Sequence, residues 1–258
     1  MTLQALLWDV DGTLAETERD GHRVAFNQAF ESLGLSWRWD EVHYGRLLAV
    51  SGGRERLLHD MSSRSDAPAL SQQRETLAVE LHALKNRFYA DRVAAGHVAL
   101  RPGVAALMAE CRAQGVRQAI TTTTSRSNVE ALLKTAFGGG WAEPFDAVVC
   151  GEDVRCKKPD PEVFLLALQR LQIGPLDAIA IEDSPGGVAA ARAAQVPVLV
   201  TLSSYFQQAT VEAALAIGPG LGQRRGWRPA LVDEGPGRVT LDDLLQWRER
   251  ADSVSQHA

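Results

Sequence analysis

The chain has 258 residues, a formal net charge of −5 and 45% hydrophobic residues, which suits one well-buried core with a smaller accessory unit. The acidic balance provides no basic stripe for nucleic acid or an anionic membrane, so we expect a small-molecule partner and a monomer. Without a secretory signal or an apolar stretch near the roughly 20 residues of a membrane span, we expect a cytoplasmic protein. The three cysteines form no C-x-x-C pair and predict reduced thiols, with neither a disulfide framework nor a zinc site.

The first predicted element is a buried strand over residues 4–9, which ends in two carboxylates, Asp9 and Asp11, and a turn at Gly12. In an open parallel sheet, ligands bind at the carboxyl ends of the strands. A turn closing an ordinary strand would explain Gly12 but only one of the acids. We predict that Asp9 is a nucleophile, because it is the first carboxylate at the strand end. Strand periodicity gives Asp11 the same side-chain direction, which suits a general acid and base.

After Thr13 the pattern stays helical for a long stretch. The first helix carries its apolar residues on one face at three- and four-residue spacing and ends at Gly34; these residues are Ala25, Phe26, Ala29, Phe30 and Leu33. Further helices are predicted over residues 40–49, 54–61 and about 72–93. We expect residues 16–97 to form a helical cap, while residues 1–15 plus 98–258 form the core.

Beyond Arg101 the chain alternates between helices and strands. Strands are predicted over 116–122, 147–150, 178–182 and 197–201, with helices ending near 114 and covering 127–136, 160–171 and 186–194. This alternation predicts an α/β fold, a Rossmann-like parallel sheet with helices on both faces and the helical cap inserted after the first strand. For residues 204–258 we expect a solvated excursion, an edge strand and a final helix over about 241–250.

Three more polar clusters follow later apolar runs, namely Thr121–Ser125, Lys157–Pro159 and Glu182–Ser184. Together with the first acids they suit a phosphate neutralised by a metal ion, because divalent cations prefer hard oxygen ligands and phosphoryl oxygens prefer cationic and hydroxyl donors. A carboxylate can also attack phosphorus to give an aspartyl-phosphate.

Each cluster supplies one candidate. Thr122 is expected to hold a phosphoryl oxygen, with the register among the four threonines open by one residue. Lys158 would neutralise the phosphoryl group and the nucleophile, with Lys157 as the alternative. Asp183 would complete a Mg²⁺ site with Glu182 beside it. An N-cap role would also explain Asp183, but it would not explain Glu182.

The motifs Asp9-x-Asp11-Gly12-Thr13, Thr122, Lys158-Pro159 and Glu182-Asp183 resemble, in this order, the four motifs of the haloacid dehalogenase superfamily, in its phosphatase and phosphomutase branch. The segments Asp9 to Glu18, Ala25-Phe26-Asn27, Trp37-x-Trp39-Asp40 and Ser51 to Arg56 are similar to the CbbY-type sugar-bisphosphate phosphatases associated with the Calvin cycle. The resemblance implies the same nucleophile and acid–base roles, and Mg²⁺ held by Asp9, Asp11 through its backbone carbonyl, and Glu182 with Asp183.

The resemblance also implies a set of substrate-facing residues, which are Glu18, His22, Tyr44, Gly52, Gly53, Arg54, Thr123 and Thr124. The glycine pair precedes a predicted helix and offers backbone N–H groups to an anion, as a second phosphate would require. Two features depart from the family. Lysine commonly stands where this chain has Arg54, and one extra residue precedes His22, which leaves this histidine open between a substrate contact and a surface position.

The sequence therefore predicts a Mg²⁺-dependent phosphatase for a phosphorylated sugar, such as the ketopentose xylulose 1,5-bisphosphate. A phosphomutase of the β-phosphoglucomutase type carries the same four motifs and is the main alternative. Accumulation of free phosphate from the substrate would distinguish the phosphatase from the phosphomutase. A phosphorylatable receiver domain of a signalling protein is a third, but it predicts a shorter chain without a cap.

Overall fold

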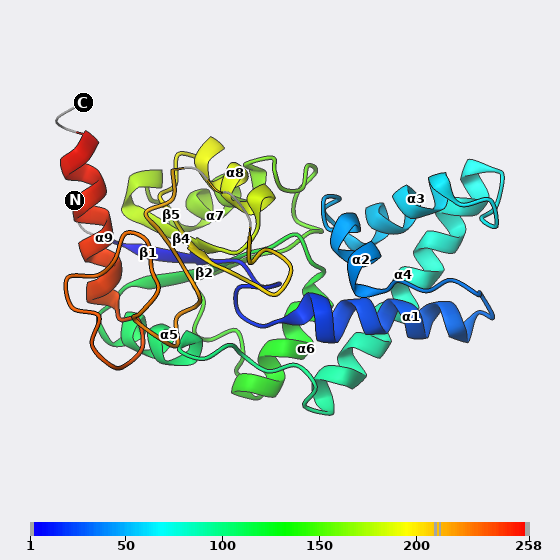
Figure 1. Ribbon diagram of the computed structural model, residues 1–258, viewed down its shortest axis with the longest axis horizontal. Helices are drawn as coiled ribbons and strands as arrows, with labels where there is room; N and C mark the ends of the chain where they lie inside the picture. Colours follow the sequence, from blue (N-terminus) through cyan, green and yellow to red (C-terminus); the bar gives the residue numbers. More distant parts are fainter. Residues whose placement is uncertain (1–2, 209–210, 212, 256–258) are drawn as a thin grey trace.

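The computed structural model describes residues 3–208, 211 and 213–255. The predicted core, residues 1–15 plus 98–258, starts and ends outside the described residues. Within this part of the chain, parallel strands form one sheet in the order β3-β2-β1-β4-β5-β6 (Figure 1). The strands are β1 (Ala5–Trp8), β2 (Arg117–Thr121), β3 (Ala147–Val149), β4 (Ala178–Glu182), β5 (Val198–Thr201) and β6 (Ala216–Gly218). The predicted α/β fold is confirmed. The order reverses direction between β1 and β4, and such a switch point opens a crevice at the carboxyl ends of the strands.

Helices cover both faces of the sheet, as the alternation of elements predicts. Side chains alternate along β1, so that Leu6 and Trp8 pack with one group of helices while Ala5 and Leu7 pack with the other. The first face is covered by α5 (Val104–Ala113), α6 (Arg126–Phe137) and α9 (Leu241–Ser255), and the second by α7 (Glu162–Leu171) and α8 (Pro185–Ala193) (Figure 1). A 3₁₀ turn at Pro175–Asp177 leads into β4.

A group of helices between β1 and β2 extends beyond the carboxyl edge of the sheet (Figure 1). It consists of a π-helical turn (Glu18–His22) and the helices α1 (Arg23–Ser32), α2 (Glu41–Leu47), α3 (Gly53–Ser63) and α4 (Ser71–Ala94). These helices have an apolar cluster of their own, built largely from aromatic rings such as Phe26, Phe30 and Trp39. We refer to these helices as the cap. None of the helices in the described residues is both long and apolar enough to traverse a bilayer.

The C-terminal segment corrects one expectation. The edge strand is present as β6, but the rest of the segment is not a solvated excursion, because Trp227 and Trp247 are both buried in the core cluster of α5 and α9. Their ring centroids lie 4.7 Å apart, and Trp247 Nε1 donates to the carbonyl of Pro229 at 2.9 Å. The Arg224 guanidinium group donates to the buried Asp243 carboxylate at 2.7 and 3.1 Å, so each of these charges is paired with one of opposite sign.

This packing makes the segment part of the core that stabilises the sheet. We expect Trp247→Ala to lower the free energy of unfolding by about 3–5 kcal/mol, since it opens a cavity beside Trp227. Trp247→Phe keeps most of the volume and should cost about 1 kcal/mol through the lost hydrogen bond. Urea unfolding provides the measurement, with Val232→Ala at an exposed position of the same segment as the control. Equal stability of Trp247→Ala and the parent chain would contradict this account.

Candidate active site

The predicted strand ends meet around the ammonium group of Lys158. Lys158 lies in the loop before α7, and its Nζ donates to Asp9 Oδ1 at 2.7 Å, to Glu182 Oε1 at 2.5 Å and to the backbone carbonyl of Thr121 at 2.8 Å. These partners follow β1 or end β4 and β2, so one side chain links three neighbouring strands. Both carboxylates are buried. Buried charges are stable only when paired and hydrogen-bonded, which the three strand ends achieve together.

Asp9, Glu182 and Asp183 form the candidate metal site. Each offers one carboxylate oxygen, and these oxygens all lie within 4.8 Å of one another. Burial raises the pKa of Asp9 to about 8 although Lys158 opposes the shift. Burial, followed by the charge of Asp9, raises the pKa of Asp183 well above its usual range. When all three carboxylates are ionised, they outnumber the single ammonium group, and a divalent cation with oxygen ligands would balance the surplus negative charge.

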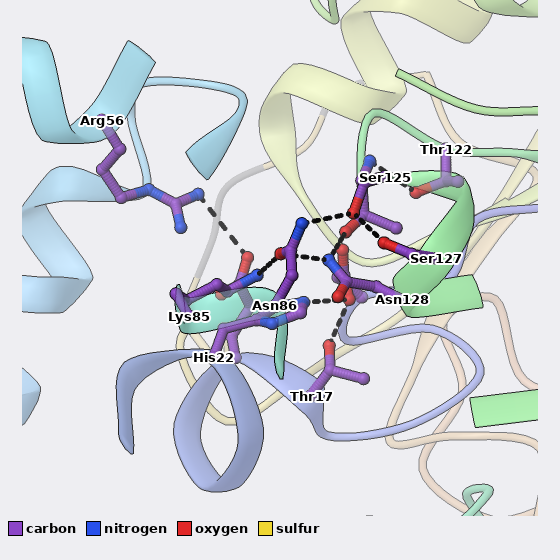
Figure 2. A network of polar contacts seen from close by, with 12 residues as sticks. Thr17, His22, Arg56, Lys85, Asn86, Thr122, Ser125, Ser127 and Asn128 are labelled. Carbon is purple, nitrogen blue, oxygen red and sulfur yellow. Dashed lines mark hydrogen bonds and ion pairs between the residues drawn. The ribbon is translucent and has the colours of Figure 1, made fainter. Parts of the chain in front are cut away.

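Asp11 reaches the same region by a route that strand periodicity does not describe. β1 ends at Trp8, so Asp11 lies in the turn beyond the strand, and the periodicity argument is wrong. Asp11 Oδ1 instead accepts from Thr17 Oγ1 at 2.5 Å and lies 2.9 Å from His22 Nε2 (Figure 2). Burial alone would raise the pKa of the Asp11 carboxyl group. The interactions with His22 and the hydrogen bond from Thr17 outweigh burial and hold this pKa well below its usual range.

The π-helical turn explains how His22 enters the site. A π turn accommodates one additional residue within a helix, and Glu18–His22 adopts this form where the extra residue had been expected. The turn buries His22, whose ring stacks on Tyr89 with centroids 4.2 Å apart. A Cβ atom at Gly21 would lie 2.8 Å from the same tyrosine ring, so the turn requires a glycine there. His22 therefore lies inside the molecule against Asp11, not at the surface.

Glu18, Tyr44 and Arg56 form a second polar group on the cap side. The Tyr44 hydroxyl donates to Glu18 Oε2, and Arg56 Nη1 donates to the Tyr44 oxygen at 2.8 Å. Arg56 Nη2 also lies 3.6 Å from Glu18 Oε1. Burial raises the pKa of Tyr44 well above its usual range, which keeps the hydroxyl a donor. Arg56 had not been predicted as a site residue, although it lies only two positions beyond Arg54.

Gly52 is the N-cap residue of α3, which begins at Gly53 at the mouth of the site. Gly52 has a φ of 94°, and a Cβ atom there would lie 2.5 Å from Lys157 Nζ. Arg54 points to the exposed side of the helix start and pairs with Glu75 at 2.5 Å. Lys157 pairs with Glu55 of α3 at 2.6 Å and so connects the core to the cap. Of the two neighbouring lysines, Lys158 is therefore the one at the nucleophile candidate.

The threonines after β2 divide between two cavities. Thr121 ends the strand, is buried and contributes its backbone carbonyl to Lys158. Thr122 lines the cavity that contains Asp9, and its Oγ1 accepts from the backbone N–H of Thr124 at 3.2 Å. Thr123 lines both cavities and Thr124 lines the outer one.

These two cavities meet between the core and the cap. The inner one, of about 70 Å³, contains Asp9, Thr122, Lys158 and Asp183. The outer one, of about 180 Å³, contains His22, Gly53, Arg54, Lys85, Thr124 and Lys157. Asp11, Glu18, Gly52, Arg56 and Thr123 line both. An elongated ligand could therefore place one end at the strand-end carboxylates and the other against the cationic groups of the cap.

A polar network joins the cap to the core beside the outer cavity (Figure 2). Lys85 of α4 is buried, and its Nζ makes one long hydrogen bond, to Asn86 Oδ1 at 3.3 Å. Asn86 in turn contacts Ser125 Oγ at 3.3 Å and Asn128 Nδ2 at 3.2 Å, both on the core side. Burial lowers the pKa of Lys85 to about 8. The helical pattern of α4 gives no signal for the role of Asn86, because its partners Ser125 and Asn128 lie far away in sequence.

Comparison with known proteins shows the family to which the chain belongs. The family model for haloacid dehalogenase-like hydrolases matches residues 3–195, and the chain belongs to this family. Among curated proteins, the plasmid-borne protein CbbY of Cupriavidus necator is 44% identical over 220 residues, which cover 85% of this chain and 86% of that protein.

Two solved structures of CbbY from Rhodobacter sphaeroides resemble most of the chain. One is in complex with phosphate and is 40% identical, with a TM-score of 0.77, covering 83% of this chain and 92% of that one. The other, a variant in complex with xylulose 1,5-bisphosphate, is 39% identical with the same TM-score and coverage. Together with the family assignment, this likeness identifies the chain as a phosphatase of the CbbY type.

Proposed function

We propose that the chain hydrolyses a phosphorylated sugar through an aspartyl-phosphate, and that its substrate is a ketopentose bisphosphate such as xylulose 1,5-bisphosphate. The pair of connected cavities carries this proposal, because the inner one offers a carboxylate beside an ammonium group and the outer one offers separate cationic groups. The CbbY structure with bound xylulose 1,5-bisphosphate supports the same choice. The expectations of a cytoplasmic location and a monomer stay predictions.

In the proposed reaction, a carboxylate oxygen of Asp9 attacks phosphorus, and the sugar oxygen leaves with a proton from Asp11. A water molecule then attacks phosphorus, Asp11 removes its proton, and inorganic phosphate leaves as the Asp9 carboxylate is restored. His22 and Thr17 keep Asp11 ionised, which suits the second step. An incoming phosphate dianion raises the pKa of a nearby carboxyl group, which favours the protonated Asp11 that the first step needs.

The other strand-end residues would hold the phosphoryl group and a cation. Lys158 and Thr122 are placed to neutralise and orient phosphoryl oxygens. Asp9, Glu182 and Asp183 fit Mg²⁺ by their number, burial and oxygen donors, and the family resemblance adds the backbone carbonyl of Asp11. A bound Mg²⁺ would supply positive charge that keeps these carboxylates ionised and offsets charge on the phosphoryl oxygens.

We further propose a division of labour in which residues 1–15 plus 98–258 carry out the chemistry and residues 16–97 select the sugar. On the cap side, Glu18 and His22 would contact sugar hydroxyls, while Gly52, Gly53 and Arg54 would hold the distal phosphate. Tyr44 is buried and lines neither cavity, so the prediction that it faces the substrate is corrected: its hydroxyl holds Glu18 instead. Arg54 can exchange partners easily, because a half-exposed ion pair such as that with Glu75 is worth only about 0–1 kcal/mol. Thr123 and Thr124 would complete the wall on the core side.

Arg54→Ala tests the distal phosphate directly. We expect it to raise the activation free energy for a ketopentose bisphosphate by about 1.5–3 kcal/mol, the range for a hydrogen bond to a charged group. Hydrolysis of p-nitrophenyl phosphate, which has no second phosphate, should barely change. Arg46→Ala, at an exposed position on α2, removes the same charge from the cap and serves as the control. Equal losses with both substrates, or no loss with either, would contradict a distal phosphate at Arg54.

A further inference from the structure

Arg101 lies where the chain returns from the cap to the core. Its guanidinium group binds backbone carbonyls from three separate segments. Nη1 donates to the carbonyl of Gly12, and Nη2 donates to the carbonyls of Leu202 at 2.7 Å and Pro219 at 3.0 Å. The backbone N–H of Arg101 also donates to the carbonyl of Leu14 at 2.7 Å. One side chain thus joins the turn after β1, the loop after β5 and the C-terminal segment.

The turn at Gly12 lies directly against the candidate metal site. A Cβ atom at Gly12 would lie 2.0 Å from Asp183 Oδ2 and 3.1 Å from Ser203 Cβ. The position of the Gly12 peptide therefore sets how closely the Asp11 turn approaches Asp183. The hydrogen bond from Arg101 to the Gly12 carbonyl holds that peptide in place.

Glu16 extends the same arrangement to the loop after β5. Glu16 Oε1 lies 3.7 Å from Arg101 Nε, and Oε2 accepts from the backbone N–H and the hydroxyl of Ser204 at 3.2 and 2.7 Å. Ser203, the preceding residue, lies beside Gly12 together with Asp183, and its side chain works against the rise in the pKa of the Asp183 carboxyl group. Arg101 and Glu16 consequently hold both the turn at Gly12 and the loop that carries Ser203.

The C-terminal segment covers this arrangement from outside. A Cβ atom at Gly103 would lie 2.4 Å from the carbonyl oxygen of Leu221, and one at Gly222 would lie 2.6 Å from Pro102 Cβ. The segment therefore packs backbone against backbone over the residues that follow Arg101. It keeps the guanidinium group directed inward, with only 11% of the side chain exposed.

We propose that Arg101 is a positioning residue for the phosphatase reaction, which holds the Asp11–Gly12 turn at the correct distance from Asp183 and is itself held by Glu16 and the C-terminal segment. The inference rests on the proposed function for the roles of Asp11 and Asp183. Arginine suits this task because its planar fork presents several fixed donors at once, whereas a lysine ammonium cannot reach carbonyls from three segments in that geometry.

Arg101→Lys tests the inference in the full-length protein. We expect kcat for p-nitrophenyl phosphate to fall about ten- to a hundredfold, because displacement of a reacting group by about 1 Å has effects of that size. The KM should change little, since Arg101 lies outside both cavities as the described residues line them. The Mg²⁺ concentration for half-maximal rate should rise, and calorimetric titration with Mg²⁺ in the absence of substrate should show weaker binding.

Arg117→Lys is the matched control. Arg117 also donates to a backbone carbonyl, that of Leu171 at 2.6 Å. It is the first residue of β2 and so lies at the amino end of the strands, away from the candidate metal site. Its variant should leave kcat and Mg²⁺ binding unchanged. In Arg101→Ala, added guanidinium ion should restore part of the activity, while sodium at the same ionic strength should not.

The outcomes separate this inference from the proposed function. Unchanged kcat and Mg²⁺ binding in Arg101→Lys would overturn the role of Arg101. If that variant fails to fold, Glu16→Gln keeps the side-chain shape and removes the ion pair, and unchanged kcat and Mg²⁺ binding in this variant would overturn the inference as well. A wild-type chain that releases no phosphate would count against the proposed function, and the Mg²⁺ titration would still decide the role of Arg101.

Discussion

Replacement of Asp9 by asparagine should remove turnover while leaving the fold intact. The amide has the shape of the carboxylate and can still accept the hydrogen bond from Lys158, but it cannot form an acyl phosphate at a useful rate. We expect phosphate release to fall by about a thousandfold or more, as when a group acting directly in the reaction is removed. Asp11→Asn should be nearly as damaging.

Stability separates this effect from misfolding. Burial raises the pKa of Asp9 to about 8, so the folded state binds a proton that the unfolded state has lost at neutral pH. Ionisation of Asp9 therefore opposes folding above the pKa of the unfolded carboxyl group, and the opposing free energy grows until the pH exceeds the folded value. In the presence of a chelator, Asp9→Asn should melt no lower than the parent chain at neutral pH.

A covalent readout completes the test of the nucleophile. Acid quenching of the parent enzyme during turnover should trap a phosphorylated peptide that contains Asp9, which peptide mass spectrometry would detect. Asp20→Asn, at an exposed carboxylate paired with Arg19, provides the control and should retain activity. Substantial phosphate release by Asp9→Asn would show that another group attacks phosphorus.

Removal of the metal is expected to have a comparable effect. EDTA should abolish phosphate release, Mg²⁺ should restore it, and Zn²⁺ should substitute poorly, since an all-oxygen set of carboxylates suits a hard cation. Asp183→Ala removes one of the anionic ligands and should raise the Mg²⁺ requirement by about a hundredfold or more, because even indirect partners of a metal ligand cost 10- to 100-fold.

The control for this prediction is Asp177→Ala, which changes a carboxylate before β4, at the opposite end of the strand from Asp183. Its Mg²⁺ requirement should match that of the parent chain. Phosphate release should be followed over a range of Mg²⁺ concentrations for each protein. Full activity in EDTA would exclude the proposed mechanism altogether.

The central residues of the site could be predicted because parallel strands bring their carboxyl ends together. Asp9, Lys158 and Glu182 lie far apart in the sequence, yet each follows an apolar run, and the sheet places them within hydrogen-bond distance. Most helices also begin and end within one or two residues of the prediction, as α4 shows with Ser71–Ala94 against 72–93. The helix boundaries could be predicted because the spacing of apolar residues within each helix is a local feature of the sequence.

Other features depend on contacts that no local pattern records. Lys85 and Asn86 occupy ordinary positions of a long helix, and only the approach of α6 gives Asn86 its hydrogen bond to Asn128. The burial of Trp227 was missed because glycine, proline and arginine surround it in the sequence. The charge of the nearby Arg224 is neutralised by Asp243, which lies 19 positions later in the sequence.

The position of β1 at the centre of the sheet has a consequence for the order of folding. This strand is made first, but its two neighbours are β2 and β4, and the contact between Asp9 and Lys158 spans 149 positions. Closing so long a loop precedes any gain from the contact, whereas the aromatic cluster of the cap joins residues close in sequence. During synthesis the cap can thus collapse early, while Asp9, the proposed nucleophile, gains its lysine and its acidic neighbours only after β4 has emerged from the ribosome. A nascent chain that stops before that strand would have a formed cap and no means of breaking a phosphate ester.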